Sequence, residues 1–209
     1  MKKFAIYSCI ALCGIFGGYF LGWRSVGGEF LSVERITPGD HETNYVVERT
    51  HLDRYNWAVP YCKGKTVADM ASGTSYGTKI LERGGAISVE GYDYKPLGQK
   101  YVMDFEKQSW SKHYDVIVSF ETIEHLANPE FFLENVRRSA NLLLLSTPYG
   151  EDHRNAFHKQ FWTLPELKEL VERHFTCEYS YQSDFAAGIL QAPMLPRGGM
   201  LAACRPRNM

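Results

Sequence analysis

In this 209-residue chain, two acidic residues and a run of small residues have the types and the spacing to bind a nucleotide-like ligand. The apolar segment TVADM contains Asp69, and the small residues of ASGTSYG, numbered 71–77, follow it. Such a turn lets the backbone pass close to a ligand before a helix begins. Asp93 lies twenty residues beyond Gly73, where an open α/β fold places a carboxylate on the ribose hydroxyls of a nucleotide. The loop and the acid together predict an adenosine-containing cofactor, whereas each alone is typical of a tight turn or a surface acid.

The carboxylate of Asp69 indicates which cofactor this is. A negative charge just before the loop would repel the pyrophosphate of NAD or FAD, and it suits a ligand that carries an ammonium and a sulfonium group. S-adenosylmethionine is such a ligand. A nicotinamide-dependent oxidoreductase is disfavoured for the same reason and because the chain lacks the G-x-G-x-x-G pattern. The alternative role for Asp69 is to cap a helix or a turn.

Strands and helices alternate along the chain, which predicts an α/β fold with a mostly parallel sheet. Polar and apolar side chains alternate in residues 176–182 and 199–206 with no helix between them, so we expect an antiparallel pair at one edge. Before the first strand, residues 41–61 show helical spacing and predict a capping helix. We expect strands at 66–70, 86–93, 114–120 and 141–148, and helices at 78–84, 129–140 and 164–175.

Only ten residues separate Asp93 from Asp104. A crossover between parallel strands needs about a dozen residues or more and usually contains a helix. The helix after the second strand should therefore be missing or reduced to a turn.

The first segment differs from the rest of the chain. Residues 4–23 carry no charge over 20 positions, and a helix of that length spans about 30 Å, enough to cross a bilayer. We expect an uncleaved membrane anchor, with a cleaved signal peptide or a buried helix as alternatives. The predicted organisation is an apolar helix at 1–24, a linker and capping helix at 25–64, and a catalytic domain at 65–209.

Composition narrows the partners and the compartment. The formal charge is −1, so no field of one sign indicates a nucleic-acid surface. The five cysteines form no CxxC pair, which disfavours a disulfide scaffold and a zinc site. We therefore expect reduced cysteines, no metal, and a cytosol-facing domain, or alternatively a cytoplasmic protein. The oligomeric state is not predicted.

Four segments in order resemble one family. VADMASGTSYG, EGYDYKP, YDVIVSFETIEHL and LLLLSTPYG are similar to the successive motifs of class I S-adenosylmethionine-dependent methyltransferases, which have a Rossmann-like fold. FETIEHL and NAFHKQFWTLPELKELVERHF resemble a bacterial and phage branch often found with glycan or cell-surface biosynthesis. The resemblance covers residues 34–205. It implies methyl transfer to a small-molecule or saccharide-like acceptor at oxygen.

The resemblance also implies roles for individual residues. Asp69 would lie under the methionine moiety, Asp93 would hold the ribose hydroxyls, and His125 would be the polar group near the acceptor. His153 and His158 are further candidates for a catalytic base. The residues that the resemblance assigns to the cofactor are Asp69, Ser72, Gly73, Thr74, Asp93, Asp104, Phe105, Ser119, Phe120 and Glu121.

Two positions depart from the family pattern. Ala71 and Ser75 stand where the family usually has glycine. A side chain at either place would strain the loop if the backbone there needs a positive φ. The alternative function is therefore a degenerate, non-catalytic domain that serves as a membrane-tethered binding or scaffold protein.

Overall fold

The computed structural model describes residues 45–150, 157–182, 189–190 and 198–207. Within this part of the chain no helix combines the length and the apolar character that crossing a membrane requires. The predicted apolar segment at 4–23 and the candidate base His153 lie outside the described residues.

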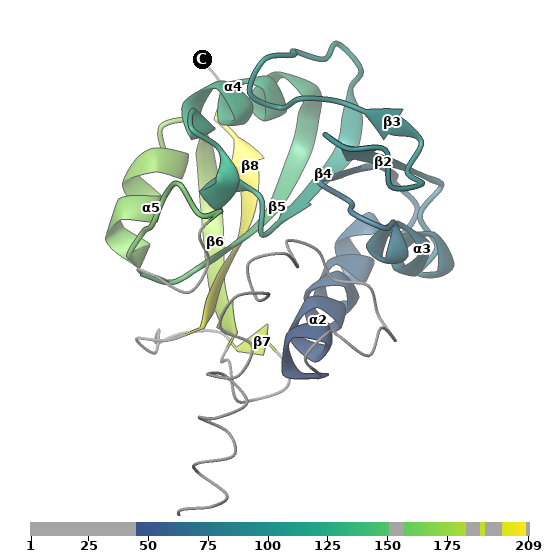
Figure 1. Ribbon diagram of the computed structural model, residues 1–209, viewed down its shortest axis with the longest axis horizontal. Helices are drawn as coiled ribbons and strands as arrows, with labels where there is room; N and C mark the ends of the chain where they lie inside the picture. The colour runs from purple at the N-terminus through teal and green to yellow at the C-terminus, as the bar shows by residue number, and fades with distance from the viewer. Residues whose placement is uncertain (1–44, 151–156, 183–188, 191–197, 208–209) are drawn as a thin grey trace, which may run out of the picture. The chain divides into compact units, whose positions relative to one another are not determined.

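A single sheet organises the described residues (Figure 1). Its strand order is β3-β2-β1-β4-β5-β8-β6-β7; the pairs from β3 to β5 are parallel, and those from β5 to β7 are antiparallel. The predicted α/β class, with a mostly parallel sheet and an antiparallel edge, is confirmed. In chain order the elements are α2 (Tyr45–Cys62), β1 (Thr66–Met70), α3 (Tyr76–Arg83), β2 (Ser88–Asp93), β3 (Tyr101–Val102), β4 (Tyr114–Phe120), the 3-10 helix η1 (Ile123–His125), α4 (Pro129–Ser139), β5 (Ala140–Pro148), α5 (Leu164–Val171), β6 (Phe175–Gln182), β7 (Ile189–Leu190) and β8 (Gly199–Pro206).

Helices cover both faces of the sheet. Figure 1 shows α2 and α3 on one side, and α4 and α5 on the other. Because side chains alternate along a strand, Ala68 and Met70 pack on the α4 and α5 side, whereas Val67 packs on the α2 and α3 side. Asp69 shares the face of Val67, so its carboxylate points toward α2 and α3.

Residues 94–100 contain no helix. Met103 N donates to Asp93 O over 2.8 Å, so the chain pairs β3 with β2 almost at once. The predicted loss of the helix after the second strand is confirmed, because seven residues are too few to cross over and return.

Local sequence signals set the starts of α4 and α5. The Asn128 side chain accepts from Phe131 N over 3.2 Å, and Pro129 begins α4. At α5 the Thr163 backbone N–H donates to Glu166 Oε2 over 2.7 Å, which satisfies a donor that a helix start leaves unpaired. The helix ends at Val171, earlier than residue 175, because β6 begins at Phe175.

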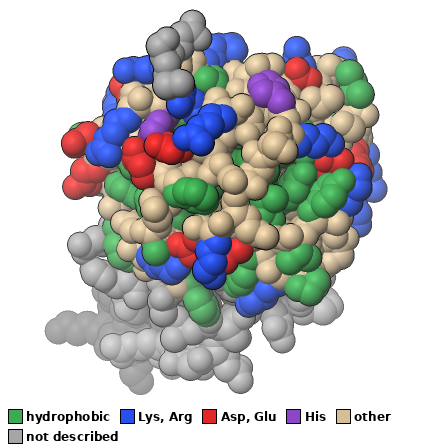
Figure 2. Space-filling model, turned by 90° about the horizontal axis from the view of Figure 1, so that it is seen from above, with side chains coloured by type: hydrophobic (Ala, Val, Ile, Leu, Met, Phe, Trp, Pro, Cys, Tyr) green, Lys and Arg blue, Asp and Glu red, His purple; other side chains and the backbone are tan. Residues whose placement is uncertain are grey.

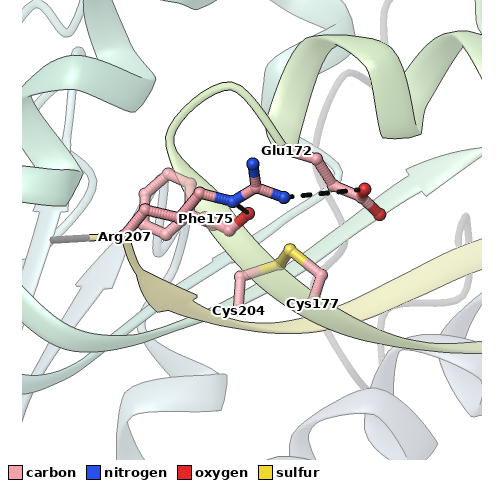
Figure 3. Close-up of a disulfide and its surroundings, with 5 residues drawn as sticks. All are labelled: Glu172, Phe175, Cys177, Cys204 and Arg207. Carbon is pink, nitrogen blue, oxygen red and sulfur yellow. Dashed lines mark hydrogen bonds and ion pairs between the residues drawn. A yellow bond between two sulfur atoms is a disulfide. The ribbon is translucent and has the colours of Figure 1, made fainter. Parts of the chain in front are cut away.

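Two cysteines are joined in the antiparallel part of the sheet (Figure 3). Cys177 on β6 and Cys204 on β8 are partners in the strand register, and they form a disulfide with a Cα–Cα distance of 4.1 Å. Beside it, Arg207 Nε donates to Phe175 O over 2.8 Å. The expectation of reduced cysteines is wrong for this pair, since strand pairing places them opposite each other; Cys62 is free and buried.

Charges of both signs are mixed on the face that Figure 2 shows. Lys and Arg side chains there alternate with Asp and Glu side chains, in line with the formal charge of −1. The described residues on this face thus present no large field of one sign.

Candidate active site

In the loop after β1, every second residue from 71 to 75 has a positive φ angle. Ala71, Gly73 and Ser75 have φ angles of 61°, 54° and 63°. Glycine adopts this left-handed region freely, whereas a residue with a Cβ is strained by about 1–2 kcal/mol. Ala71 and Ser75 therefore hold the backbone shape that glycine usually provides, at a cost in stability.

Hydrogen bonds fasten this loop to β2. Ser72 N donates to Tyr92 O over 2.9 Å, and Gly73 N donates to Asp93 Oδ2 over 3.0 Å. Gly91 in β2 makes the close approach possible, because a Cβ there would lie 2.9 Å from Ser72 Oγ. Gly73 and Asp93, which the sequence assigned to one cofactor, are thus in direct contact.

The carboxylate of Asp69 is fully buried on the α2 and α3 side of the sheet. Tyr55 Oη donates to Oδ1 over 3.0 Å, and Thr78 Oγ1 donates to Oδ2 over 2.8 Å. Burial raises the pKa of Asp69 from 3.8 to about 7, although the bonds from Thr78 and Tyr55 counter it. Gly77 leaves room for Tyr55, since a Cβ there would lie 1.9 Å from Tyr55 Cζ.

Asp104 and Phe105 follow β3. The Asp104 carboxylate pairs with Lys107 Nζ at 2.8 Å, and Lys107 lowers the pKa of Asp104. Phe105 is buried and makes edge contacts with the rings of Trp110 and Phe132. These two residues have partners of their own, and their predicted contact with adenine stays a prediction.

The end of β4 lies beside the end of β1, because Ser119 is the register partner of Met70. Ser119 Oγ is buried without a hydrogen-bond partner among the described residues. Phe120 packs its ring edge-on against Tyr55. Glu121 has a φ of 49°, accepts from Ser146 Oγ over 2.8 Å and pairs with Arg54 Nη1 at 3.2 Å.

Three ionisable side chains gather just beyond β4. Ligand atoms of Glu124, His125 and His158 all lie within 4.8 Å of one another. Glu124 is 1% exposed, and its pKa is raised well above the ordinary value by burial and by the Glu121 carboxylate. His125 Nδ1 lies 3.1 Å from Phe157 O. Because a carbonyl oxygen only accepts, Nδ1 carries a proton, and Nε2 is the nitrogen that accepts when the ring carries a single proton.

The structure brings most of the predicted residues to one edge of the sheet. Asp69, Ser72, Gly73, Thr74 and Asp93 belong to the joined ends of β1 and β2. Ser119 and Phe120 end the adjacent strand β4, and Glu121 follows it.

Sequence reasoning missed the residues that hold these groups. Tyr55 and Thr78 bind Asp69, and Arg54 binds Glu121. Helical spacing placed Tyr55 and Arg54 in a helix but gave no partner for them. Glu124 stands in the quoted motif FETIEHL, one residue before His125, without having been assigned a role.

Comparison with known families gives one match over most of the chain. A family model described as a methyltransferase domain matches residues 52–185. A search of curated proteins gives no significant match.

Solved structures share the fold at low sequence identity. A TehB-like S-adenosylmethionine-dependent methyltransferase from Corynebacterium glutamicum is 16% identical, with a TM-score of 0.60 over 91% of this chain and 97% of that one. The N-methyltransferase NodS from Bradyrhizobium japonicum, in complex with S-adenosylhomocysteine, is 12% identical, with a TM-score of 0.61 over 88% and 98%. A Burkholderia thailandensis 1,6-didemethyltoxoflavin N1-methyltransferase with bound 1,6-didemethyltoxoflavin and S-adenosylhomocysteine is 14% identical, with a TM-score of 0.57 over 84% of this chain and 94% of that one. At these identities the likeness shows the fold alone.

Proposed function

The chain belongs to the methyltransferase domain family whose model covers residues 52–185, and we propose that it methylates an oxygen atom of a small-molecule or saccharide-like acceptor. Its methyl donor is S-adenosylmethionine, which supplies, when bound, a methyl group activated by attachment to a positively charged sulfur. The observation that carries the proposal is the bond from Gly73 N to Asp93 Oδ2, 3.0 Å long. This bond brings together the small-residue loop and the acid, the two features that contact a nucleotide in an open α/β fold.

The residues of this edge fit that cofactor. Asp93 Oδ2 and Oδ1 accept from the backbone N–H groups of Gly73 and Lys95. These bonds hold the carboxylate at the end of β2, where an open α/β fold places the acid that binds a ribose. A Cβ built on Gly73 would meet nothing within 4 Å, so the loop has open space beside it. Ser119 Oγ is buried without a partner among the described residues, and a ligand between the ends of β1 and β4 would supply one.

An oxygen acceptor must lose its hydroxyl proton when the methyl group arrives. His125 supports this step, since its Nε2 is the accepting nitrogen and η1 holds it just beyond β4. Positioning supplies much of the remaining acceleration in such a displacement. The solved neighbours include N-methyltransferases, so amines belong in the test beside hydroxyl compounds.

Calorimetric titration of the purified full chain tests the cofactor site, with detergent present because of the apolar segment at 4–23. We expect S-adenosylmethionine to bind and NAD not to bind. Asp93→Ala should weaken binding at least about tenfold, because it removes charge-assisted hydrogen bonds to the ribose. Asp115→Ala is the matched control, since it removes a carboxylate from the amino-terminal end of β4, which is the opposite edge of the sheet.

Circular dichroism checks that both variants are folded. Absence of heat with S-adenosylmethionine, or equal affinity in Asp93→Ala and the parent, would contradict the proposal. Transfer of labelled methyl to hydroxyl-bearing but not amine-bearing acceptors would support oxygen as the methylated atom.

For the location we propose a membrane anchor at 4–23 with the catalytic domain facing the cytosol, where S-adenosylmethionine is supplied. The Cys177–Cys204 disulfide argues for the other side, because disulfides persist in oxidising compartments. A reporter enzyme that is active on only one side of the membrane, fused to the carboxyl terminus, would decide between the two orientations.

A further inference from the structure

Glu124 has an oxygen that no group in the described part of the chain satisfies. Thr147 Oγ1 donates to Oε2 over 3.1 Å, but Oε1 is buried without a hydrogen-bond partner. A buried carboxylate oxygen without a partner is costly, by about 1–3 kcal/mol or more. One carboxylate oxygen of Glu124 and one imidazole nitrogen from each of His125 and His158 lie within 4.8 Å of one another.

Backbone hydrogen bonds bring the two histidines together across 32 residues of sequence. Glu124 O accepts from Lys159 N over 2.8 Å and from Gln160 N over 3.1 Å, while Phe157 O accepts from His125 Nδ1 over 3.1 Å. His158 lies between these bonded residues, and its ring centroid is 4.8 Å from that of His125. The segment that carries His158 is thus fastened to η1 on both sides of this residue.

The tautomer of His125 is the one a metal ligand needs. A histidine that binds a cation through Nε2 usually donates Nδ1–H to a carbonyl or carboxylate, which fixes the ring and raises its basicity. Phe157 O fills that place for His125.

The donor set determines which cation would fit. One carboxylate oxygen and two imidazole nitrogens suit ions from Mn²⁺ to Zn²⁺, whereas Ca²⁺ and Mg²⁺ prefer sites made of oxygen. Ligand atoms on one such ion lie about 3–4 Å apart at its usual bond lengths. Small side-chain rotations would close the observed spacing of up to 4.8 Å to that range.

We propose that Glu124, His125 and His158 bind a divalent first-row transition-metal ion. The site departs from the sequence prediction of no metal, which considered cysteine pairs. Three protein ligands leave at least one coordination position for water or substrate. A role in catalysis rests on the proposed function: the ion would hold the acceptor hydroxyl and lower the pKa of that hydroxyl, so that its proton leaves to water. With the ion bound, this replaces proton acceptance by His125, whose Nε2 is then a ligand. Binding itself does not depend on methyl transfer.

Titration of the metal-free full chain with Co²⁺ tests the site through the visible d–d absorption of the ion. We expect one Co²⁺ per chain, displaced by Zn²⁺. Glu124→Gln keeps the side-chain shape and His158→Ala removes a ligand, and each should weaken Co²⁺ binding at least about tenfold. His174→Ala is the matched control, because His174 Nε2 pairs with Glu130 at 2.7 Å outside this site.

Two results would overturn the metal site: no Co²⁺ binding to the parent, or equal binding by the parent and His158→Ala. His158 is only partly buried, so its variant should fold even if Glu124→Gln does not. The tests fail separately, since Co²⁺ binding without S-adenosylmethionine binding contradicts the proposed function alone, and the reverse contradicts the metal site alone.

Discussion

The two halves of the sheet differ in backbone strain and in how firmly their strands are joined. In the parallel half, the segments that follow β1 and β4 contain residues with a Cβ at positive φ, namely Ala71, Ser75 and Glu121. In the antiparallel half, β8 is in register with β5 and β6 over most of its length, and the Cys177–Cys204 disulfide joins β6 to β8. Among the described residues no non-glycine residue of β5, β6 or β8 has a positive φ.

From this difference we infer that the parallel half binds the ligand and that the antiparallel half stabilises the fold. Strained backbone and unpaired buried polar atoms persist only where the surrounding structure fixes them. The antiparallel ribbon, paired and cross-linked, supplies such a fixed frame next to β4 and β5. We therefore expect changes in the parallel half to alter ligand binding and pH response, and changes in the antiparallel half to alter stability alone.

The largest effect is expected from Asp69→Asn. Folding raises the pKa of Asp69 from 3.8 to about 7, so between these values the native state holds a proton that the unfolded state has lost. The stability contribution of Asp69 then falls as pH rises, by about 1.4 kcal/mol per pH unit and about 4 kcal/mol in all. Asn does not titrate, so in urea denaturation from pH 4 to 8 the variant should gain stability relative to the parent.

Asp115→Asn is the control for this pH series. Hydrogen bonds from the backbone and side chain of Thr66 lower the pKa of Asp115, so it stays charged throughout the range. Its stability difference from the parent should be constant above pH 5. If the free energies of unfolding of Asp69→Asn and the parent change in parallel with pH, Asp69 gives the parallel half no pH response of its own.

The second effect is expected from Cys177→Ala combined with Cys204→Ala. The disulfide closes a loop with a sequence separation of 27, and removing such a cross-link should lower the free energy of unfolding by about 3.5 kcal/mol in the chain-entropy model. Urea denaturation measures the loss. Affinity for S-adenosylmethionine, measured by calorimetry, should not change.

Reductant provides the matched control for the double variant. Dithiothreitol should lower the stability of the parent to that of the variant and leave the variant unchanged, because Cys62 is the remaining described cysteine and is free. A loss of cofactor affinity in the variant would show that the antiparallel half also affects binding at the carboxyl ends of the parallel strands.

The sequence predicted features that depend on local pattern. Alternating strands and helices gave the sheet class, and the interval before Asp104 gave the missing helix. Each of these follows from residues near one another in the chain, where side-chain period and connection length limit the outcome.

The sequence predicted that residues 176–182 and 199–206 pair, but it did not predict features that depend on the exact register or on contacts between other distant segments. The register of β6 and β8 places Cys177 opposite Cys204, and no periodicity specifies a register. Likewise, the neighbourhood of Glu124 and His158 depends on hydrogen bonds between two loops distant in sequence. The sequence predicted that Ala71 and Ser75 strain the loop if the backbone there has a positive φ. The structure shows that both residues have a positive φ.

The smallest effect is expected from glycine in the loop after β1. Ala71→Gly and Ser75→Gly relieve a left-handed backbone worth about 1–2 kcal/mol but add about 0.5–1 kcal/mol of unfolded-state entropy, so each should stabilise by about 0.5–1 kcal/mol in urea denaturation. Gly73→Ala is the reverse control, because its φ is 54° and its Cβ would meet nothing within 4 Å, so it should destabilise through the backbone alone. Ser75→Ala keeps the strain and removes only the unpartnered Oγ, so it separates the backbone term from the cost of that buried hydroxyl. If Ser75→Gly stabilises no more than Ser75→Ala, the stress at this edge lies in its polar atom and not in its backbone.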